Sequence, residues 1–223
     1  VQHGRDAEIA SQRAIADVGV TNMTQTKVIA IRGERLALAH YFVLDSWGGS
    51  EVLGVSEINA ENQIVACVAF DPDDLDAAFE ELDARYVAGE AAAHSDTWSV
   101  IAEAHARFNR RELPATTPDP VYIDHRPLVS IEGVDLAASV RAVWDLTSDA
   151  NIYVEAVHRL SELGAVTTQA LKGTWQEGSD AEWRMIMMFA VEGGLISRIE
   201  VFDEADLDAA LARFDELDRP ACP

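Results

Sequence analysis

The sequence has few cysteines, few basic residues and no long apolar run. Cys67 and Cys222 are the two cysteines among 223 residues, too few for a disulfide framework or a cysteine-rich zinc site. No apolar run approaches the ~18 residues that a membrane-spanning helix needs. Lys and Arg number 17 against 39 Asp and Glu, which gives a formal net charge of −22. Such a chain repels phosphate backbones and anionic lipids, so we expect no nucleic-acid partner, no membrane partner and a cytoplasmic location.

The composition is that of a folded protein longer than one average domain. Hydrophobic residues make up 48% of the sequence and charged residues 25%, which excludes bulk disorder. The length predicts one core of good size, with room for a smaller second one. The sequence starts at Val1 without an initiator methionine. We therefore expect a processed chain or a part of a longer one.

A segment near the middle of the sequence returns near its end. The ten residues FDPDDLDAAF at 70–79 recur as FDEADLDAAL at 202–211, 132 positions later, with seven identities. The correspondence continues backwards without a gap, so that the apolar run 53–69 lies over 185–201. Both copies are typical of a strand, a tight turn, a second strand and a capped helix. The sequence therefore predicts two related domains in tandem.

The first copy is predicted to be shortened at its front. A helix is expected at 7–18, before four strands. Asp71 is expected to cap the helix after the strands, with Pro72 in its first turn. The expected strands lie at 26–31, 35–44, 50–58 and 63–70. The predicted division is a truncated first domain at 1–72, a connecting helix at 73–92 that also covers the first sheet, and a complete second domain at 93–223.

The second copy contains helices and strands that the first lacks. Ser95 is expected to cap a helix with an apolar stripe, on which His105 is interpreted as a core histidine. Asp135 is expected to cap a second helix, and a final helix is expected to start at Asp203. Between them come four strand-like runs, at 151–160, 165–176, 181–191 and 195–202.

This order of elements resembles the nuclear transport factor 2-like superfamily. Within it, the segment 122–144, from Tyr-Ile-Asp-His-Arg-Pro through Gly133 to Trp144, is similar to the SnoaL-like polyketide cyclase branch. The ending Arg-Ile-Glu-Val-Phe-Asp at 198–203 resembles the closing strand of limonene epoxide hydrolase-like members. The repeated Phe-Asp-x-x-Asp-Leu-Asp-Ala-Ala is similar to tandem domains at the C-terminal ends of actinobacterial regulatory proteins.

The resemblance implies an α+β fold of two tandem cone-shaped domains, the first without its leading helices. Each domain is expected to be a curved antiparallel sheet packed against helices, with an apolar pocket on the concave face. Side chains alternate along a strand, so placing Glu200 on the concave face selects the pocket residues of the neighbouring strands. The expected ligand-binding residues are Tyr122, Trp144, Thr168, Ala170, Arg184, Ile186, Met188, Arg198 and Phe202.

The same resemblance supplies candidate catalytic residues. Glu200 stands where epoxide hydrolase-like members carry an acid on the last strand. Their arginine and aspartate on an earlier strand fall on Ala170 and Lys172, so the water-activating device is broken, and Lys172 is left to donate to a leaving oxygen. Asp124 and His125 fall near the base of ketosteroid isomerase-like and SnoaL-like members. A base and an acid around an apolar pocket suit proton transfer beside a carbonyl.

Structural roles are the alternative for the same residues. Glu200 would then form an ion pair with Lys172 or Arg184, and such pairs also perturb pKa values. Asp124 and His125 would then only turn the chain at the end of their strand. Tryptophans such as Trp144 are then core residues rather than platforms for a ligand.

Two functions from different classes follow from this sequence. The first is the binding of a small apolar organic ligand, as the ligand-sensing part of a regulator. The second is a cofactor-independent acid–base enzyme of the isomerase, cyclase or epoxide hydrolase type, whose turnover would vanish in Glu200→Gln. Neither function calls for a cofactor or a metal. Val68 stands in the first copy where Glu200 stands in the second, so the first copy is expected to be a structural partner, by intrachain pairing of the domains or in a homodimer.

Overall fold

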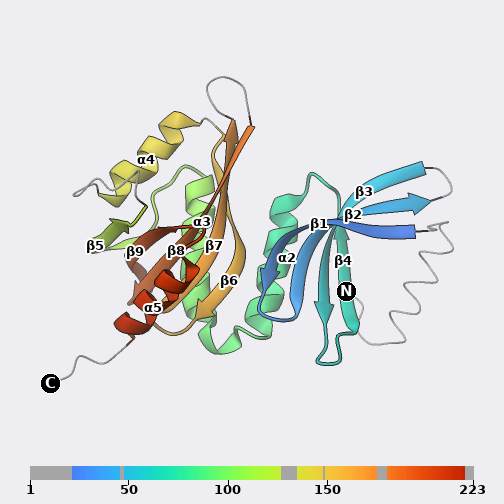
Figure 1. Cartoon of the computed structure of the whole chain (residues 1–223), viewed down its shortest axis with the longest axis horizontal. Helices are drawn as coiled ribbons and strands as arrows, with labels where there is room; N and C mark the ends of the chain where they lie inside the picture. The colour runs from blue at the N-terminus through green and yellow to red at the C-terminus, as the bar shows by residue number, and fades with distance from the viewer. Residues whose placement is uncertain (1–21, 46–47, 127–134, 148, 175–179, 219–223) are drawn as a thin grey trace. The chain divides into compact units, whose positions relative to one another are not determined.

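The chain divides into two compact units, residues 1–92 and 93–223 (Figure 1). Each unit has its own curved sheet and its own helices, so the predicted α+β class is confirmed. The helix expected at 7–18 lies outside the described residues. In the described part of the chain, no helix is both long and apolar enough to cross a membrane. The structure is a computed structural model that describes residues 22–45, 48–126, 135–147, 149–174 and 180–218.

The first unit is a four-stranded antiparallel sheet with a helix packed on it. The strands lie side by side in the order of the sequence, as expected for a chain of hairpins. Helix α2 (Leu75–Ala88) turns Ala78, Leu82 and Tyr86 inward, and the carboxylate of Asp83 accepts a 2.7 Å hydrogen bond from the buried guanidinium of Arg32. This helix therefore belongs to the core of the first unit. The strands are β1 (Asn22–Arg32), β2 (Leu36–Asp45), β3 (Gly48–Ile58) and β4 (Ile64–Phe70).

The second unit is a five-stranded sheet with helices on both faces. The strand order is β5-β9-β8-β7-β6, in which β6 to β9 are antiparallel neighbours and β5 runs parallel to β9. The strands are β5 (Thr116–Asp124), β6 (Asn151–Leu160), β7 (Gly164–Thr174), β8 (Asp180–Glu192) and β9 (Leu195–Asp203). The 3₁₀ turn η1 (Ala92–His94) precedes the helices, which are α3 (Ser95–Asn109), α4 (Leu136–Leu146) and α5 (Leu207–Leu217).

The two faces of this sheet are covered by different helices. Helix α3 contacts β6 to β9 and α4 contacts β5, whereas α5 contacts β7 to β9. On the α5 face, Ile186, Met188 and Phe202 form a packed cluster with Ala210 and Phe214 of the helix. Because both faces are covered, β8 is apolar at successive positions rather than at every second one, as in sheets buried on both sides.

The repeated segment forms the same turn in both units. The amide of Asp74 donates to the carbonyl of Asp71 at 3.0 Å, and the amide of Asp206 donates to that of Asp203 at the same distance. Helices α2 and α5 start after this turn, with Asp74 and Asp206 as N-caps that make no side-chain cap bond. The predicted starts at Asp71 and Asp203 are therefore corrected, because a backbone turn precedes each helix.

The hairpins before these turns differ by one residue in strand register. Val68 pairs with Val55 in the first unit, whereas Glu200, 132 positions after Val68, pairs with Met188 rather than with the equivalent of Val55. The second hairpin closes through Gly193 and Gly194, which have φ of 59° and 78°. Both angles suit the two-residue hairpin turns that require positive φ. The ungapped sequence correspondence thus does not carry over to the strand pairing.

The predicted caps of the second unit had different outcomes. Asp135 is the N-cap of α4, and its carboxylate accepts a hydrogen bond from the amide of Ala138 at 2.8 Å, as predicted. Ser95 is instead the first residue of α3, and its N-cap is His94, which makes no side-chain cap bond. The hydroxyl of Ser99 donates to the carbonyl of Ser95, so Ser95 takes part in the helix through its backbone.

Candidate functional site

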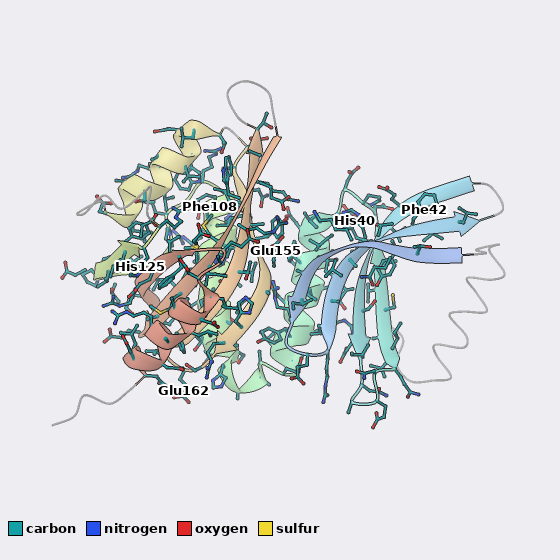
Figure 2. All side chains as sticks on the ribbon, in the orientation of Figure 1. His40, Phe42, Phe108, His125, Glu155 and Glu162 are labelled. Atoms are coloured by element: carbon teal, nitrogen blue, oxygen red, sulfur yellow. The ribbon has the colours of Figure 1, made fainter. Side chains whose placement is uncertain are left out.

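An apolar cavity of about 160 Å³ lies between the sheet of the second unit and helices α3 and α4. Its wall comes from α3, α4 and the side chains of β7, β8 and β9 that point away from α5. Phe108, which is labelled in Figure 2, stands in this wall on α3. Apolar side chains of the wall include Phe108, Val140, Met185, Met187, Phe189 and Val201. Such a lining favours a ligand that is itself largely apolar.

Tyr122 and Arg126 are polar members of the wall, and both have partners in the protein. Burial raises the pKa of the Tyr122 phenol, which also shares a hydrogen bond with Ser139 of the wall. The guanidinium of Arg126 donates to the two carboxylate oxygens of Asp124 at 2.6 and 3.0 Å. Burial acts to raise the pKa of Asp124, but these bonds outweigh it and hold the pKa below its usual range. Asp124 is thus the anionic partner of Arg126.

His105 is a wall residue whose orientation is fixed by its own helix. Its Nδ1 lies 2.7 Å from the carbonyl oxygen of Ile101, and a carbonyl only accepts, so Nδ1 carries the proton and donates it. The ring packs edge-on against Phe189, with 5.6 Å between the centroids. In the neutral imidazole, Nε2 is therefore the basic nitrogen. The apolar stripe led us to interpret this residue as part of the core, whereas the structure places it at the cavity.

Gln169 is a fully buried amide in the same wall. Its Nε2 donates to the hydroxyl oxygen of Thr167 at 3.2 Å, and that hydroxyl donates to the carbonyl of Met187 at 3.4 Å. Among the described residues, Oε1 of Gln169 has no hydrogen-bond partner. Sequence analysis missed this residue because a glutamine inside an apolar strand was not weighed as a polar wall group.

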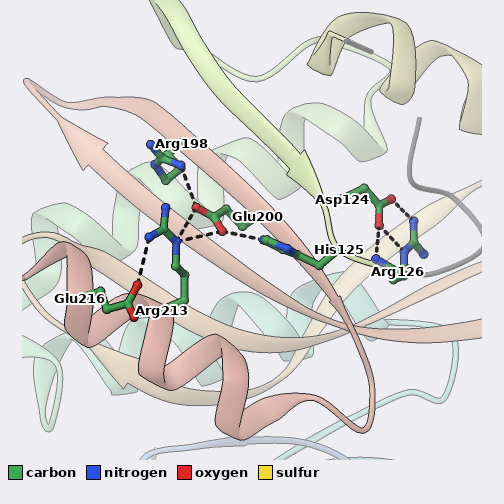
Figure 3. A network of polar contacts seen from close by, with 7 residues as sticks. All are labelled: Asp124, His125, Arg126, Arg198, Glu200, Arg213 and Glu216. Atoms are coloured by element: carbon green, nitrogen blue, oxygen red, sulfur yellow. Dashed lines mark hydrogen bonds and ion pairs between the residues drawn. The ribbon is translucent and has the colours of Figure 1, made fainter. Parts of the chain in front are cut away.

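The predicted acid Glu200 lies on the opposite face of the sheet, beneath α5 (Figure 3). Its carboxylate is 0% exposed and accepts hydrogen bonds from Arg198 at 2.7 Å and from Arg213 of α5 at 3.2 Å. Its other oxygen lies 2.7 Å from Nε2 of His125. Burial acts to raise the pKa of Glu200, but these three partners together lower it. The group is thus a buried ion-pair network.

His125 joins this network rather than the cavity. Its ring stacks on Phe202 with 4.3 Å between the centroids, and its backbone amide donates to the carbonyl of Val201. Asp124 and His125 are neighbours that point to opposite sides of the sheet, as side chains in a strand do. Figure 3 shows Asp124 paired with Arg126 and His125 directed at Glu200. The structure thus brings His125 and Glu200 together and keeps Asp124 apart from them.

The cavity lies on the face of the sheet opposite to the one predicted from the sequence to be concave. Of the residues proposed from sequence, Tyr122 lines the cavity in the described part of the chain. The strand residues that line it are the alternates of those predicted, such as Met187 in place of Met188 and Val201 in place of Glu200. Since the side-chain period of a strand is two, anchoring the wrong residue inverts every assignment on that sheet. Ile186, Met188 and Phe202, which were predicted as ligand-binding residues, pack beneath α5.

The other predicted residues have partners of their own outside the cavity. Arg184 pairs with Glu155 at 2.8 Å and with Glu182, and Lys172 lies 3.6 Å from Glu182, so neither cation is the partner of Glu200. Oγ1 of Thr168 hydrogen-bonds to His158, and Ala170 is buried opposite Tyr153 and Arg184. Trp144 packs against Phe108 and Arg111, and Arg198 is bound to Glu200.

Glu200 forms an ion pair, as the structural alternative expected. Its partners are Arg198 and Arg213 rather than Lys172 or Arg184. Arg213 was missed because α5 was interpreted only through its apolar stripe. A basic residue on that helix close to the sheet is the signal that could have found it. Within the described ranges, no three His, Cys, Asp or Glu side chains gather as a metal site requires.

No protein-family model matches the sequence, and no curated protein matches it. Several solved structures are similar to about half of this chain. AclR from Streptomyces galilaeus is 14% identical with a TM-score of 0.43, and the match covers 55% of this chain and 98% of that one. A SnoaL-like protein from Jannaschia sp. CCS1 is 15% identical with a TM-score of 0.40, covering 58% and 96%. The Δ5-3-ketosteroid isomerase from Mycobacterium sp. is 17% identical with a TM-score of 0.41, covering 50% and 95%.

Each match spans about half of this chain and nearly all of the solved structure. At these identities and TM-scores the matches carry no conclusion about the ligand or the reaction of this chain. The ligand and any reaction are therefore argued from the residues of this chain.

Proposed function

We propose that the second unit binds a small, mostly apolar organic molecule in the cavity beneath α3 and α4. The observation that carries the proposal is a cavity of about 160 Å³ in a wall of aromatic, aliphatic and thioether side chains. Protein interiors are close-packed, and an apolar cavity of about 150 Å³ is large enough to hold a benzene ring. A few polar groups in an apolar wall is the usual arrangement of a small-molecule site.

A cavity-filling substitution tests this proposal. Val140 lines the cavity from α4, so the larger side chain in Val140→Phe should occupy the space that a ligand needs. Binding of ring-sized probes such as toluene, followed by calorimetry and by the shift of the melting temperature, should be lost in this variant. The matched control is Val121→Phe on β5, at a position 37% exposed and outside the wall, which should bind as the wild type does.

Two outcomes would contradict the proposal. The first is a wild-type protein that binds none of the ring-sized probes at millimolar concentration. The second is equal binding in Val140→Phe and wild type, which would place the probes somewhere other than the cavity. Circular dichroism of both variants verifies that a loss of binding is not a loss of fold.

Acid–base catalysis is the second candidate, and it is favoured by His105. With Nδ1 donating to a backbone carbonyl, the neutral imidazole carries its lone pair on Nε2. Beside an apolar cavity, such a base suits proton transfer next to a carbonyl, as an isomerase or cyclase requires. Incubation with small epoxides, cyclic ketones and polyketide-like enols, followed by mass spectrometry, decides between the two. Product from wild type and none from His105→Phe supports the enzyme, and unchanged compounds that still bind support the binding module.

We also propose a role, a set of partners and a location for the protein. A ligand-sensing role within a regulator fits a unit that binds without turnover. The formal net charge of −22 favours partners other than nucleic acid or anionic membranes, and the scarcity of cysteine is compatible with the cytoplasm. Pairing of the two domains within the chain, or of two chains, is tested by measuring the mass of the protein in solution.

A further inference from the structure

Among the described residues of the cavity wall, Gln169 carries a fully buried amide whose hydrogen bonding is incomplete. Its side chain is 0% exposed, and Oε1 has no partner among the described residues. Buried acceptors in folded proteins are nearly always paired, so an unpaired one in a cavity wall calls for an explanation. A ligand that brings a hydrogen-bond donor supplies one.

The hydrogen bonds around Gln169 leave the oxygen of its amide as the unpaired end. The hydroxyl of Thr167 uses its single hydrogen on the carbonyl of Met187 at 3.4 Å. Its oxygen is thus left to accept, and the amide nitrogen of Gln169 is the donor that faces it at 3.2 Å. Turning the amide over would make the Thr167 hydroxyl leave Met187 and donate to Oε1, and the amide nitrogen would then lose its acceptor, so the group would hold one hydrogen bond fewer. The carbonyl oxygen Oε1 is therefore the unpaired end, and it requires a donor.

The charge of the wall points to a neutral ligand. The guanidinium of Arg126 already donates to both oxygens of Asp124, so that pair presents little net charge to the cavity. Burial raises the pKa of Tyr122, which keeps this phenol neutral. An anion would meet an unpaired carbonyl oxygen in a protein with a formal net charge of −22.

We propose that the ligand is a neutral, ring-sized molecule that carries a hydroxyl or N–H group and donates it to Oε1 of Gln169. This proposal rests on the proposed function, because it assigns the chemical class of the molecule that the same cavity takes. The apolar wall holds the ring, and the amide selects for the donor. A purely apolar ring fits the same space but offers Oε1 no hydrogen-bond donor.

Binding of three probes of similar shape tests the assignment. Phenol offers a donor, anisole an acceptor only, and toluene neither. Wild-type protein should bind phenol at least about tenfold more tightly than toluene or anisole, by isothermal calorimetry. In Gln169→Met, a side chain of similar length without an acceptor, toluene should bind at least as well as in wild type, and the preference for phenol should disappear.

The outcomes separate this proposal from the proposed function. Equal binding of phenol and toluene by wild type would overturn the donor assignment and leave the binding function standing. A preference for phenol that persists in Gln169→Met would also overturn it, because the donor would then bond elsewhere. Binding of none of the three probes would overturn the binding function itself. Gln169→Met removes a buried unpaired acceptor together with the bond that the amide donates to Thr167, so its melting temperature should stay close to that of wild type, and its far-ultraviolet circular dichroism verifies the fold.

Discussion

The two faces of the five-stranded sheet in the second unit differ in how completely their buried polar groups are hydrogen-bonded. On the α5 face, the carboxylate of Glu200 is enclosed by Arg198, Arg213 and His125, and the apolar side chains around it are packed. On the α3 and α4 face, the apolar wall encloses space, and the amide oxygen of Gln169 has no partner among the described residues. One face thus has the properties of a core, and the other has those of a binding site.

This contrast shows that the most conspicuous ionisable residue is a poor guide to the site. A buried carboxylate is costly unless it is paired, so its presence alone indicates that partners exist close by. A buried carboxylate is paired in structural ion-pair networks and in active sites alike, so the pairing does not tell the two apart. The polar residue in the cavity wall is instead Gln169, a neutral amide whose oxygen has no hydrogen-bond donor among the described residues.

Neighbouring methionines on β8 give the sharpest test of this difference. Met188 is fully buried beneath α5, whereas Met187 is partly exposed at the cavity wall. Met188→Ala should lower the free energy of unfolding by about 2–5 kcal/mol, because it opens a void in a packed region. Met187→Ala should cost less than half of that, because its side chain already borders space. Urea denaturation of both variants measures the two losses.

The same two variants should differ in the reverse order in ligand binding. Met187→Ala changes the cavity wall and should change the affinity for toluene, while Met188→Ala, as long as it remains folded, should leave that affinity close to wild type. Equal losses of stability for the two variants would contradict the contrast between the faces. Unfolding curves with and without toluene give both readouts from one set of samples.

Substitution of Glu200 should have the next largest effect. Glu200→Gln keeps the shape but removes the charge that Arg198, Arg213 and His125 surround. Hydrogen bonds to charged groups contribute about 1.5–3 kcal/mol, so we expect a loss of about 2 kcal/mol in the free energy of unfolding. Glu216→Gln is the matched control, because this exposed carboxylate also pairs with Arg213, and its loss should be within about 0.5 kcal/mol.

The pH dependence of this loss follows from the direction of the pKa shift. The pKa of Glu200 is lowered in the folded protein from an ordinary value of 4.5, against the opposing effect of burial. Its contribution to stability is therefore complete above the ordinary pKa and is lost as the pH falls through the lower, folded pKa. The difference between wild type and Glu200→Gln should shrink in acid below about pH 4.5. A difference that grows in acid would contradict the assignment of Glu200 as a buried carboxylate ion pair.

Most of the fold could be predicted from local patterns in the sequence. The strands of both units, the helix at Ser95–Asn109 and the cap at Asp135 follow from apolar periodicity and capping chemistry. Helix starts were the weaker part, because the aspartates at 71 and 203 suit both a cap and a turn. The one-residue difference in hairpin register depends on pairing between strands, which local sequence does not specify.

The site was harder to predict than the fold for a specific physical reason. Residues 185–191 of β8 are apolar without interruption, because α5 covers one face and the cavity lies on the other. The alternation of apolar and polar side chains then carries no information about which face borders the pocket. The predicted face therefore depended on the placement of Glu200 alone. Tyr122 lies on β5, outside that choice of face, and it lines the cavity.

A titration of methionine methyl resonances with toluene tests most directly where the ligand binds. The methyl groups of Met185 and Met187 belong to the cavity wall, and that of Met188 lies on the opposite face of the same strand. We expect large, saturable shifts of Met185 and Met187 and a much smaller change at Met188. Shifts largest at Met188, or no saturable shift at Met185 and Met187, would contradict the proposal that this cavity is the binding site.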